Sequence, residues 1–162
     1  MEENDMEYKE RRSPRLPTYD YSNFGTYFLT ICTHEKKCIF GDSVKSHPAK
    51  QVVEDVVQYL IEHENHFKVL KYVVMPNHMH LLLAKKSDSD VSVSDFVRRL
   101  KSFTTRQLRN CQKNGEISNL PEQIWQRSFH DRVVRDEREF EMVWTYIENN
   151  PKKWELDCFY KG

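Results

Sequence analysis

Residues 72–83 constrain the fold of this chain more than any other segment. Their sequence, YVVMPNHMHLLL, joins two apolar and β-prone runs across the Pro76-Asn77 dipeptide. Proline fixes its own φ and lacks a backbone donor, so the dipeptide predicts a tight corner. The runs on either side of the corner, residues 67–75 and 78–84, therefore predict an antiparallel β-hairpin.

Two histidines occupy alternate positions at the start of the second run. Because side chains alternate between the faces of a strand, His78 and His80 share one face, while the apolar residues at 79, 81 and 83 take the other. Two imidazoles about 7 Å apart along a strand can tilt onto one divalent ion. The same pattern also fits two core histidines with satisfied hydrogen bonds. The sequence thus predicts half of a metal site and leaves the core interpretation open.

The rest of the chain alternates between β-prone runs and amphipathic helical patterns. We expect strands at 27–33 and 132–135, and helices at 50–64, after the N-cap Ser94, and at 136–149 before Pro151. The resulting order, β-α-β-β-α-β-α, predicts an α/β sandwich close to the ferredoxin-like fold, with an antiparallel sheet that carries the two histidines.

The length of 162 residues suits one domain with a core of its own. Residues 1–23 lack apolar periodicity and are expected to form an N-terminal arm, which leaves a single domain over residues 24–162. No apolar run approaches the roughly 20 residues that cross a bilayer, and the acidic start does not resemble a secretory signal. We therefore expect a cytoplasmic protein with no membrane partner. The four cysteines lack metal-binding spacing and are expected to be reduced.

Charge is unevenly distributed although the formal net charge is zero. Residues 1–10 hold five acids and one base, whereas residues 95–115 hold six bases and one acid. On a helical projection these bases fall opposite the apolar side chains, except Arg99, which lies at the edge. Such a face suits contacts with nucleic-acid phosphates, and it equally suits the solvated side of a surface helix. The candidate DNA contacts on it are Arg98, Lys101, Arg106 and Arg109.

The last predicted helix carries a tyrosine beside its packing stripe. Phe140, Val143, Trp144 and Ile147 cluster on one side and form the expected apolar stripe. Tyr146 lies about 100° from the centre of that stripe, and Asn150 follows it one turn later on the same side. This arrangement suits the rim of a site. It also fits a half-buried tyrosine with its hydroxyl in water.

These segments resemble the single-tyrosine HUH transposases, and most closely the REP-associated tyrosine transposases. The resemblance runs in order from residue 11 to about residue 156. It is carried by RRSPRL (11–16), YDYS (19–22), YFLTICT (27–33), VMPNHMH (74–80), WQRSFHDRVVR (125–135) and YIENNP (146–151).

The resemblance implies roles for several of the matching residues. His78 and His80 would hold a catalytic Mg²⁺ or Mn²⁺, Asn150 would be a polar third ligand, and Tyr146 would be the nucleophile. DNA contacts would come from a basic arm with Arg11, Arg12 and Arg15, which in that family helps to recognise hairpins, and from the motif with Trp125, Gln126 and Arg127. For Trp125 a structural anchor remains an equally good interpretation.

The expected function is metal-dependent cleavage and rejoining of single-stranded or hairpin DNA through a 5′-phosphotyrosine. No P-loop occurs, so no nucleotide cofactor is expected. Two rival functions stay open: a hairpin DNA- or RNA-binding protein without catalysis, and a metal-dependent phosphodiester hydrolase. The sequence leaves both a monomer and a homodimer possible.

Overall fold

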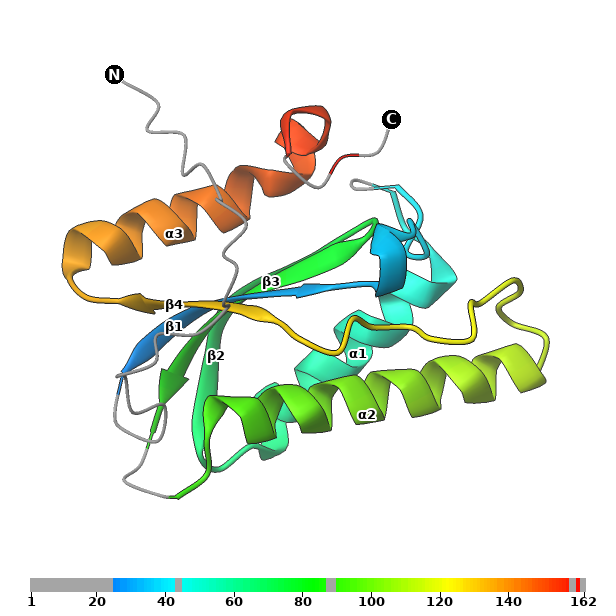
Figure 1. The fold of residues 1–162 in the computed structure, drawn as a ribbon, viewed down its shortest axis with the longest axis horizontal. Coiled ribbons are helices and arrows are strands. Elements are labelled where there is room, and N and C mark those ends of the chain that lie inside the picture. The colour runs from blue at the N-terminus through cyan, green and yellow to red at the C-terminus, as the bar shows by residue number, and fades with distance from the viewer. Residues whose placement is uncertain (1–24, 43–44, 87–89, 158–159, 161–162) are drawn as a thin grey trace.

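The computed structural model describes residues 25–42, 45–86, 90–157 and 160. The predicted arm at residues 1–23 lies outside these ranges, so Arg11, Arg12 and Arg15 are not placed. Three layers make up the described part, with α1 and α2 on one face of a four-stranded sheet and α3 on the other (Figure 1). The elements are β1 (Thr26–Cys32), η1 (His34–Lys36), α1 (Pro48–His63), β2 (Phe67–Met75), β3 (His78–Lys85), α2 (Val93–Lys113), β4 (His130–Val134), α3 (Glu137–Asn149) and η2 (Asn150–Leu156).

The sheet has the strand order β2-β3-β1-β4, and every neighbouring pair is antiparallel. This order and the succession of elements confirm the predicted ferredoxin-like sandwich. The β2–β3 hairpin turns at Pro76-Asn77, as the sequence predicts. Strand β3 is central, and all but one of its residues are buried. Its histidines are therefore held by strands on both sides.

The alternation predicted for β3 is confirmed. Met79, Leu81 and Leu83 belong to the large core that α1 and α2 cover. On the other face Leu82 packs with Phe28 and with the apolar side of α3. Apolar burial against helices on both faces fixes the register of β3, since a slip of one residue would reverse every side chain. His78 and His80 consequently point to the α3 side of the sheet.

Two details of the predicted elements are wrong. Helix α2 begins after Ser92 rather than after Ser94, because Ser92 and Asp95 form a capping box in which each side chain bonds the other residue's backbone N–H. Trp144 is not part of the apolar stripe of α3. It is 36% exposed and lies under the ammonium of Lys71. The fully buried side chains of α3 are Val143 and Ile147, and the partly buried Phe140 and Tyr146 pack against the same cluster.

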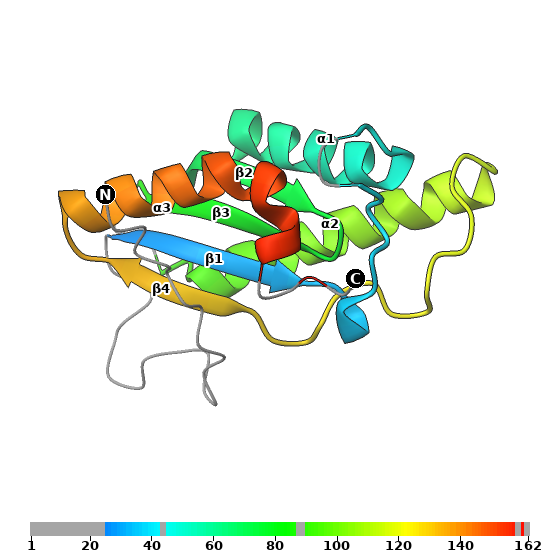
Figure 2. The same ribbon diagram turned by 90° about the horizontal axis from the view of Figure 1, so that it is seen from above.

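Helix α3 ends as predicted at Asn149, but the chain does not leave the domain there. The short helix η2 follows at once, with Pro151 in its first turn, where a missing backbone N–H costs no hydrogen bond. Figure 2 shows η2 on the same side of the sheet as α3. No helix in the described ranges is both long and apolar enough to cross a membrane.

Candidate active site

The two histidines of β3 form a buried pair on the α3 side of the sheet. Their Nε2 atoms are 3.1 Å apart, and both side chains are fully buried. Each Nδ1 atom has a polar neighbour of its own. Thr30 Oγ1, directly across from His80 on β1, is 2.9 Å from His80 Nδ1, and Asn77 Oδ1 is 2.8 Å from His78 Nδ1. Both rings therefore turn their Nε2 atoms towards the same point.

Burial keeps both imidazoles neutral. It holds the pKa of His78 well below its ordinary value, and the neighbouring His80 lowers it further, while an interaction with Asn150 opposes this effect. Burial also lowers the pKa of His80 to about 3. A neutral imidazole is the form that binds a metal ion. The pair is thus ready to act as a ligand at neutral pH.

Two oxygen-bearing side chains reach the histidine pair from the end of α3 and from η2. Asn150 is buried, and its Oδ1 makes no hydrogen bond of normal geometry within the described part of the chain. Its Nδ2 donates to Asp157 Oδ2 over 3.1 Å. That same carboxylate oxygen lies 3.7 Å from His78 Nε2. One ligand atom from each of His78, His80 and Asp157 lies within 4.8 Å of the others.

These donors fit a divalent ion. Two nitrogens bound to one ion at about 2.1 Å and at right angles lie about 3 Å apart, close to the observed 3.1 Å. Asn150 Oδ1 is buried without a hydrogen bond of normal geometry, although Asn150 interacts with His78. A buried amide oxygen in this state is costly unless a ligand satisfies it. Imidazole nitrogens together with amide and carboxylate oxygens form a mixed donor set that divalent ions accept.

Tyr146 lies next to the histidine pair. Its ring is half-buried and meets the ring of His80 edge-on, with 5.3 Å between centroids, and the ring of Phe28 at 5.9 Å. Because α3 packs through Val143 and Ile147, the tyrosine sits on the flank of the helix beside the pair. The structure therefore brings His78, His80, Tyr146 and Asn150 together.

We expect the metal-free protein to lose stability in mild acid because of His80. Its pKa of about 3 in the folded state lies below the ordinary 6.5, so the unfolded chain binds the proton more readily. The contribution of neutral His80 to the free energy of unfolding is complete above pH 6.5 and is lost as the pH falls towards 3. At pH 5 the loss is about 2 kcal/mol. Urea unfolding in EDTA at pH 7.5 and pH 5 measures it, and His80→Gln should reduce the loss by that amount. An equal loss in His80→Gln would contradict this assignment.

The predicted DNA contacts lie elsewhere, around α2. Arg98 is exposed and pairs with Asp95, and the exposed Arg106 lies 5.2 Å from the centroid of the Phe103 ring. Lys101 and Arg109 instead bind the segment 121–128. Lys101 Nζ donates to the carbonyls of residues 126, 127 and 128, and Arg109 donates to those of residues 121 and 122.

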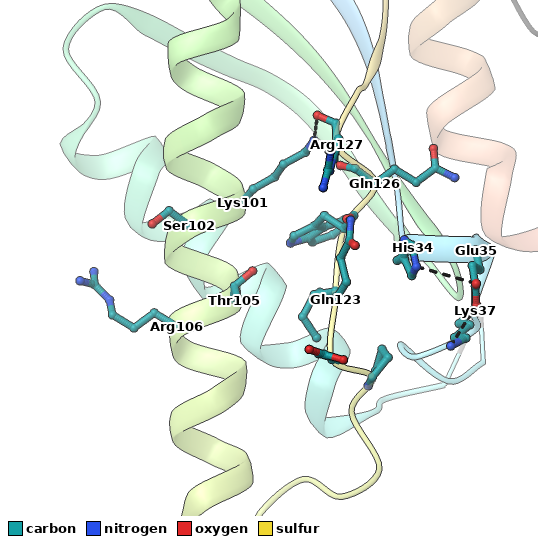
Figure 3. A pocket seen from close by; sticks show the side chains of 14 residues that line it. His34, Glu35, Lys37, Lys101, Ser102, Thr105, Arg106, Gln123, Gln126 and Arg127 are labelled. Atoms are coloured by element: carbon teal, nitrogen blue, oxygen red, sulfur yellow. Dashed lines mark hydrogen bonds and ion pairs between the residues drawn. The ribbon is translucent and has the colours of Figure 1, made fainter.

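Trp125 anchors this segment. Its side chain is buried, and its Nε1 donates a hydrogen bond to Thr104 Oγ1 of α2 over 2.9 Å. These contacts fit the role of a structural anchor, which the sequence left open. The segment and α2 border an open pocket of about 1000 Å³, with η1 on its far side (Figure 3). None of the residues lining it belongs to the histidine–tyrosine group. The charged and polar residues that line the pocket include Arg106, Gln126, Arg127, His34 and Lys37.

Sequence reasoning missed three polar residues around the histidine pair. Asp157 lies after Pro151, where the helical pattern stops, and carries no local signal. Thr30 could have been found from the strand pattern, since β1 pairs with β3 in a register that sets it opposite His80. His130 lies opposite Thr30 on β4, on the same face of the sheet, and burial lowers its pKa.

Comparison by sequence finds related proteins. An uncharacterized protein of Haemophilus influenzae is 31% identical over 175 residues, which cover 93% of either chain. An inferred REP-associated tyrosine transposase of the same organism is 29% identical over 143 residues, covering 83% of this chain and 74% of the relative.

Solved structures show the same fold. A REP-associated tyrosine transposase bound to a REP hairpin superposes with a TM-score of 0.60 at 19% identity, covering 88% of this chain and 76% of that one. An inferred transposase from Deinococcus radiodurans R1 superposes with a TM-score of 0.53 at 21% identity, covering 83% of this chain and 95% of that one. The sequence pattern of the family described as "Transposase IS200 like" matches residues 23–150. The chain therefore belongs to the IS200-like transposase family.

Proposed function

We propose that this transposase-family chain cleaves and rejoins single-stranded DNA through a 5′-phosphotyrosine, with the help of a divalent metal ion, at hairpin-forming repeats. The observation that carries the proposal is the pair of Nε2 atoms 3.1 Å apart with the ring of Tyr146 beside them. One chain supplies all of these groups. The proposed site therefore needs no residue from a second subunit.

His78, His80 and Asp157 would hold the ion, with the buried Oδ1 of Asn150 as a further ligand. Mn²⁺ or Mg²⁺ at this position would withdraw charge from the non-bridging oxygens of a scissile phosphate and orient it. Tyr146 needs that help, because a phenol with a pKa near 10 is a weak nucleophile at neutral pH.

The reaction at Tyr146 would be a reversible exchange of phosphate esters. The phenolic oxygen bonds to phosphorus as the bond to the 3′-oxygen breaks. The phenol loses its proton to solvent, and the departing 3′-oxygen gains one. Tyr146 then carries the 5′-phosphate, and a 3′-hydroxyl from another strand can reverse the step. The ester bond keeps the energy for rejoining, so no nucleotide cofactor is required.

The DNA backbone would contact the basic side of α2 and the neighbouring pocket. Arg98, Arg106 and Arg127 are exposed there, and the arm with Arg11, Arg12 and Arg15 would add further contacts. A solved relative is bound to a REP hairpin, which supports a hairpin as the ligand. Affinity would then fall steeply as salt rises, because phosphate contacts release counterions.

The test is a covalent-adduct assay with an end-labelled DNA hairpin that has single-stranded flanks. We expect a protein-linked band that survives denaturation, forms with Mn²⁺ or Mg²⁺, and disappears in EDTA. Unrelated single strands of the same length are the control.

Two rival functions give different results in the same assay. A hairpin-binding protein without catalysis would shift the DNA in a native gel and leave it intact in every metal. A hydrolase that activates water at His78 and His80 would release cut DNA with no protein attached. Either outcome would contradict the proposed phosphotyrosine.

A further inference from the structure

The corner that precedes the histidine pair is fastened to the turn after β1. Asn77 is fully buried at this corner. Its backbone carbonyl accepts hydrogen bonds from the backbone N–H of Thr33 at 2.9 Å and from the Thr33 hydroxyl at 3.0 Å. Buried groups with several satisfied bonds have little freedom to move. The backbone of Asn77 is thus held in one place.

The side chain of Asn77 has different partners at its two ends. Nδ2 donates to the carbonyl of Lys36 over 3.2 Å, while Oδ1 lies 2.8 Å from His78 Nδ1. Turning the amide over would set Oδ1 against the Lys36 carbonyl, and two acceptors would face one another. Asn77 Oδ1 therefore faces His78. Because an amide oxygen can only accept a hydrogen bond, His78 Nδ1 must carry the proton.

The turn that receives Nδ2 is itself unusual. Glu35 and Lys36 have φ values of 54° and 52°, a left-handed conformation that is uncommon for residues other than glycine. Such a conformation persists only where the surroundings hold it. The hydrogen bond from Asn77 Nδ2 to the Lys36 carbonyl is one contact that stabilises it. Asn77 thus links this turn directly to His78.

His80 is held by other groups. Its Nδ1 lies 2.9 Å from Thr30 Oγ1, and His80 also interacts with the backbone of Leu29. These contacts come from β1 and do not involve Asn77. The effect of Asn77 on the pair therefore passes through His78.

We propose that Asn77 is a positioning residue that holds His78 in its Nδ1–H form, so that the Nε2 lone pair always faces the metal position. This inference rests on the proposed metal site.

Two measurements test the role of Asn77. Ring ¹⁵N NMR of the metal-free protein reports which nitrogen of each histidine carries the proton, and calorimetric titration gives the affinity for Mn²⁺. We expect His78 to be fully Nδ1–H in the wild type and mixed in Asn77→Ala. The Mn²⁺ affinity of Asn77→Ala should fall by about 10- to 100-fold, as for other residues that orient metal ligands.

Two further variants separate this role from a general loss of structure. Asn77→Asp keeps an acceptor for His78 Nδ1, so it should keep the Nδ1–H form even if Asn77→Ala does not fold. Thr33→Val removes the hydrogen bonds of the Thr33 hydroxyl to the carbonyls of Asn77 and Lys37 and leaves the Asn77 side chain in place, so it should leave both readouts unchanged.

The inference is overturned if Asn77→Ala keeps a fully Nδ1–H His78 and wild-type Mn²⁺ affinity, or if Asn77→Asp loses the Nδ1–H form. A wild-type protein that binds neither Mn²⁺ nor Mg²⁺ would overturn the proposed metal site instead. The NMR spectra decide the role of Asn77 in either case.

Discussion

The variant Tyr146→Phe is expected to form no covalent DNA adduct, a loss of about 10³-fold or more, because it lacks the only atom that can form the phosphotyrosine there. Its ring can keep the packing against His80 and Phe28. Hairpin affinity and thermal stability should therefore stay close to those of the wild type. Denaturing gels measure the adduct, and native gels measure binding.

Tyr59→Phe is the matched control for this prediction. Tyr59 is 52% exposed on α1, on the opposite side of the sheet from Tyr146, and stacks on His63. Its variant should form the adduct at the wild-type rate. An adduct that persists in Tyr146→Phe would show that another residue is the nucleophile.

The second large effect is expected from His80→Gln. Glutamine retains much of the size of histidine, but it cannot present a neutral ring nitrogen at the position where the two Nε2 atoms meet. We expect the stabilisation of the protein by Mn²⁺ to disappear and the rate of adduct formation to fall by about 10²- to 10³-fold. Thermal melts with and without Mn²⁺, and single-turnover gels, measure the two effects.

His63→Gln controls for the loss of a histidine as such, since His63 is exposed at the end of α1. It should keep both the Mn²⁺ response and the rate. Full Mn²⁺ stabilisation in His80→Gln would mean that the ion binds elsewhere, and the role assigned to the histidine pair would be wrong.

The position of the histidine pair was predictable because it depends on local pattern alone. The Pro76-Asn77 break and the apolar run after it imply a hairpin, and strand alternation then sets His78 and His80 on one face. Burial of the opposite face against α1 and α2 leaves no other register. The flank position of Tyr146 follows in the same way from helical periodicity.

What the sequence could not supply depends on contacts between distant segments. The side chain of Asp157 meets His78 only because η2 turns back over the sheet after Pro151. Likewise, Lys101 and Arg109 look like phosphate ligands on a helical projection. Their bonds to the backbone of residues 121–128 appear only when the loop is placed beside α2.

The start of α2 shows how two local signals can compete. Ser92 and Ser94 are both good N-caps by residue type. Asp95 decides between them, because it lies three residues after Ser92 and can return a hydrogen bond to its backbone. A capping-box search rather than a single-residue preference would have placed the helix correctly.

The account is tested most directly by identifying the residue that becomes linked to DNA. Wild-type protein is incubated with Mn²⁺ and a flanked hairpin, digested with nuclease and trypsin, and analysed by mass spectrometry. We expect a single modified peptide that carries a 5′-linked nucleotide on Tyr146. Linkage at another residue, or cleaved DNA with no modified peptide, would contradict the proposed pairing of the tyrosine with the histidine site.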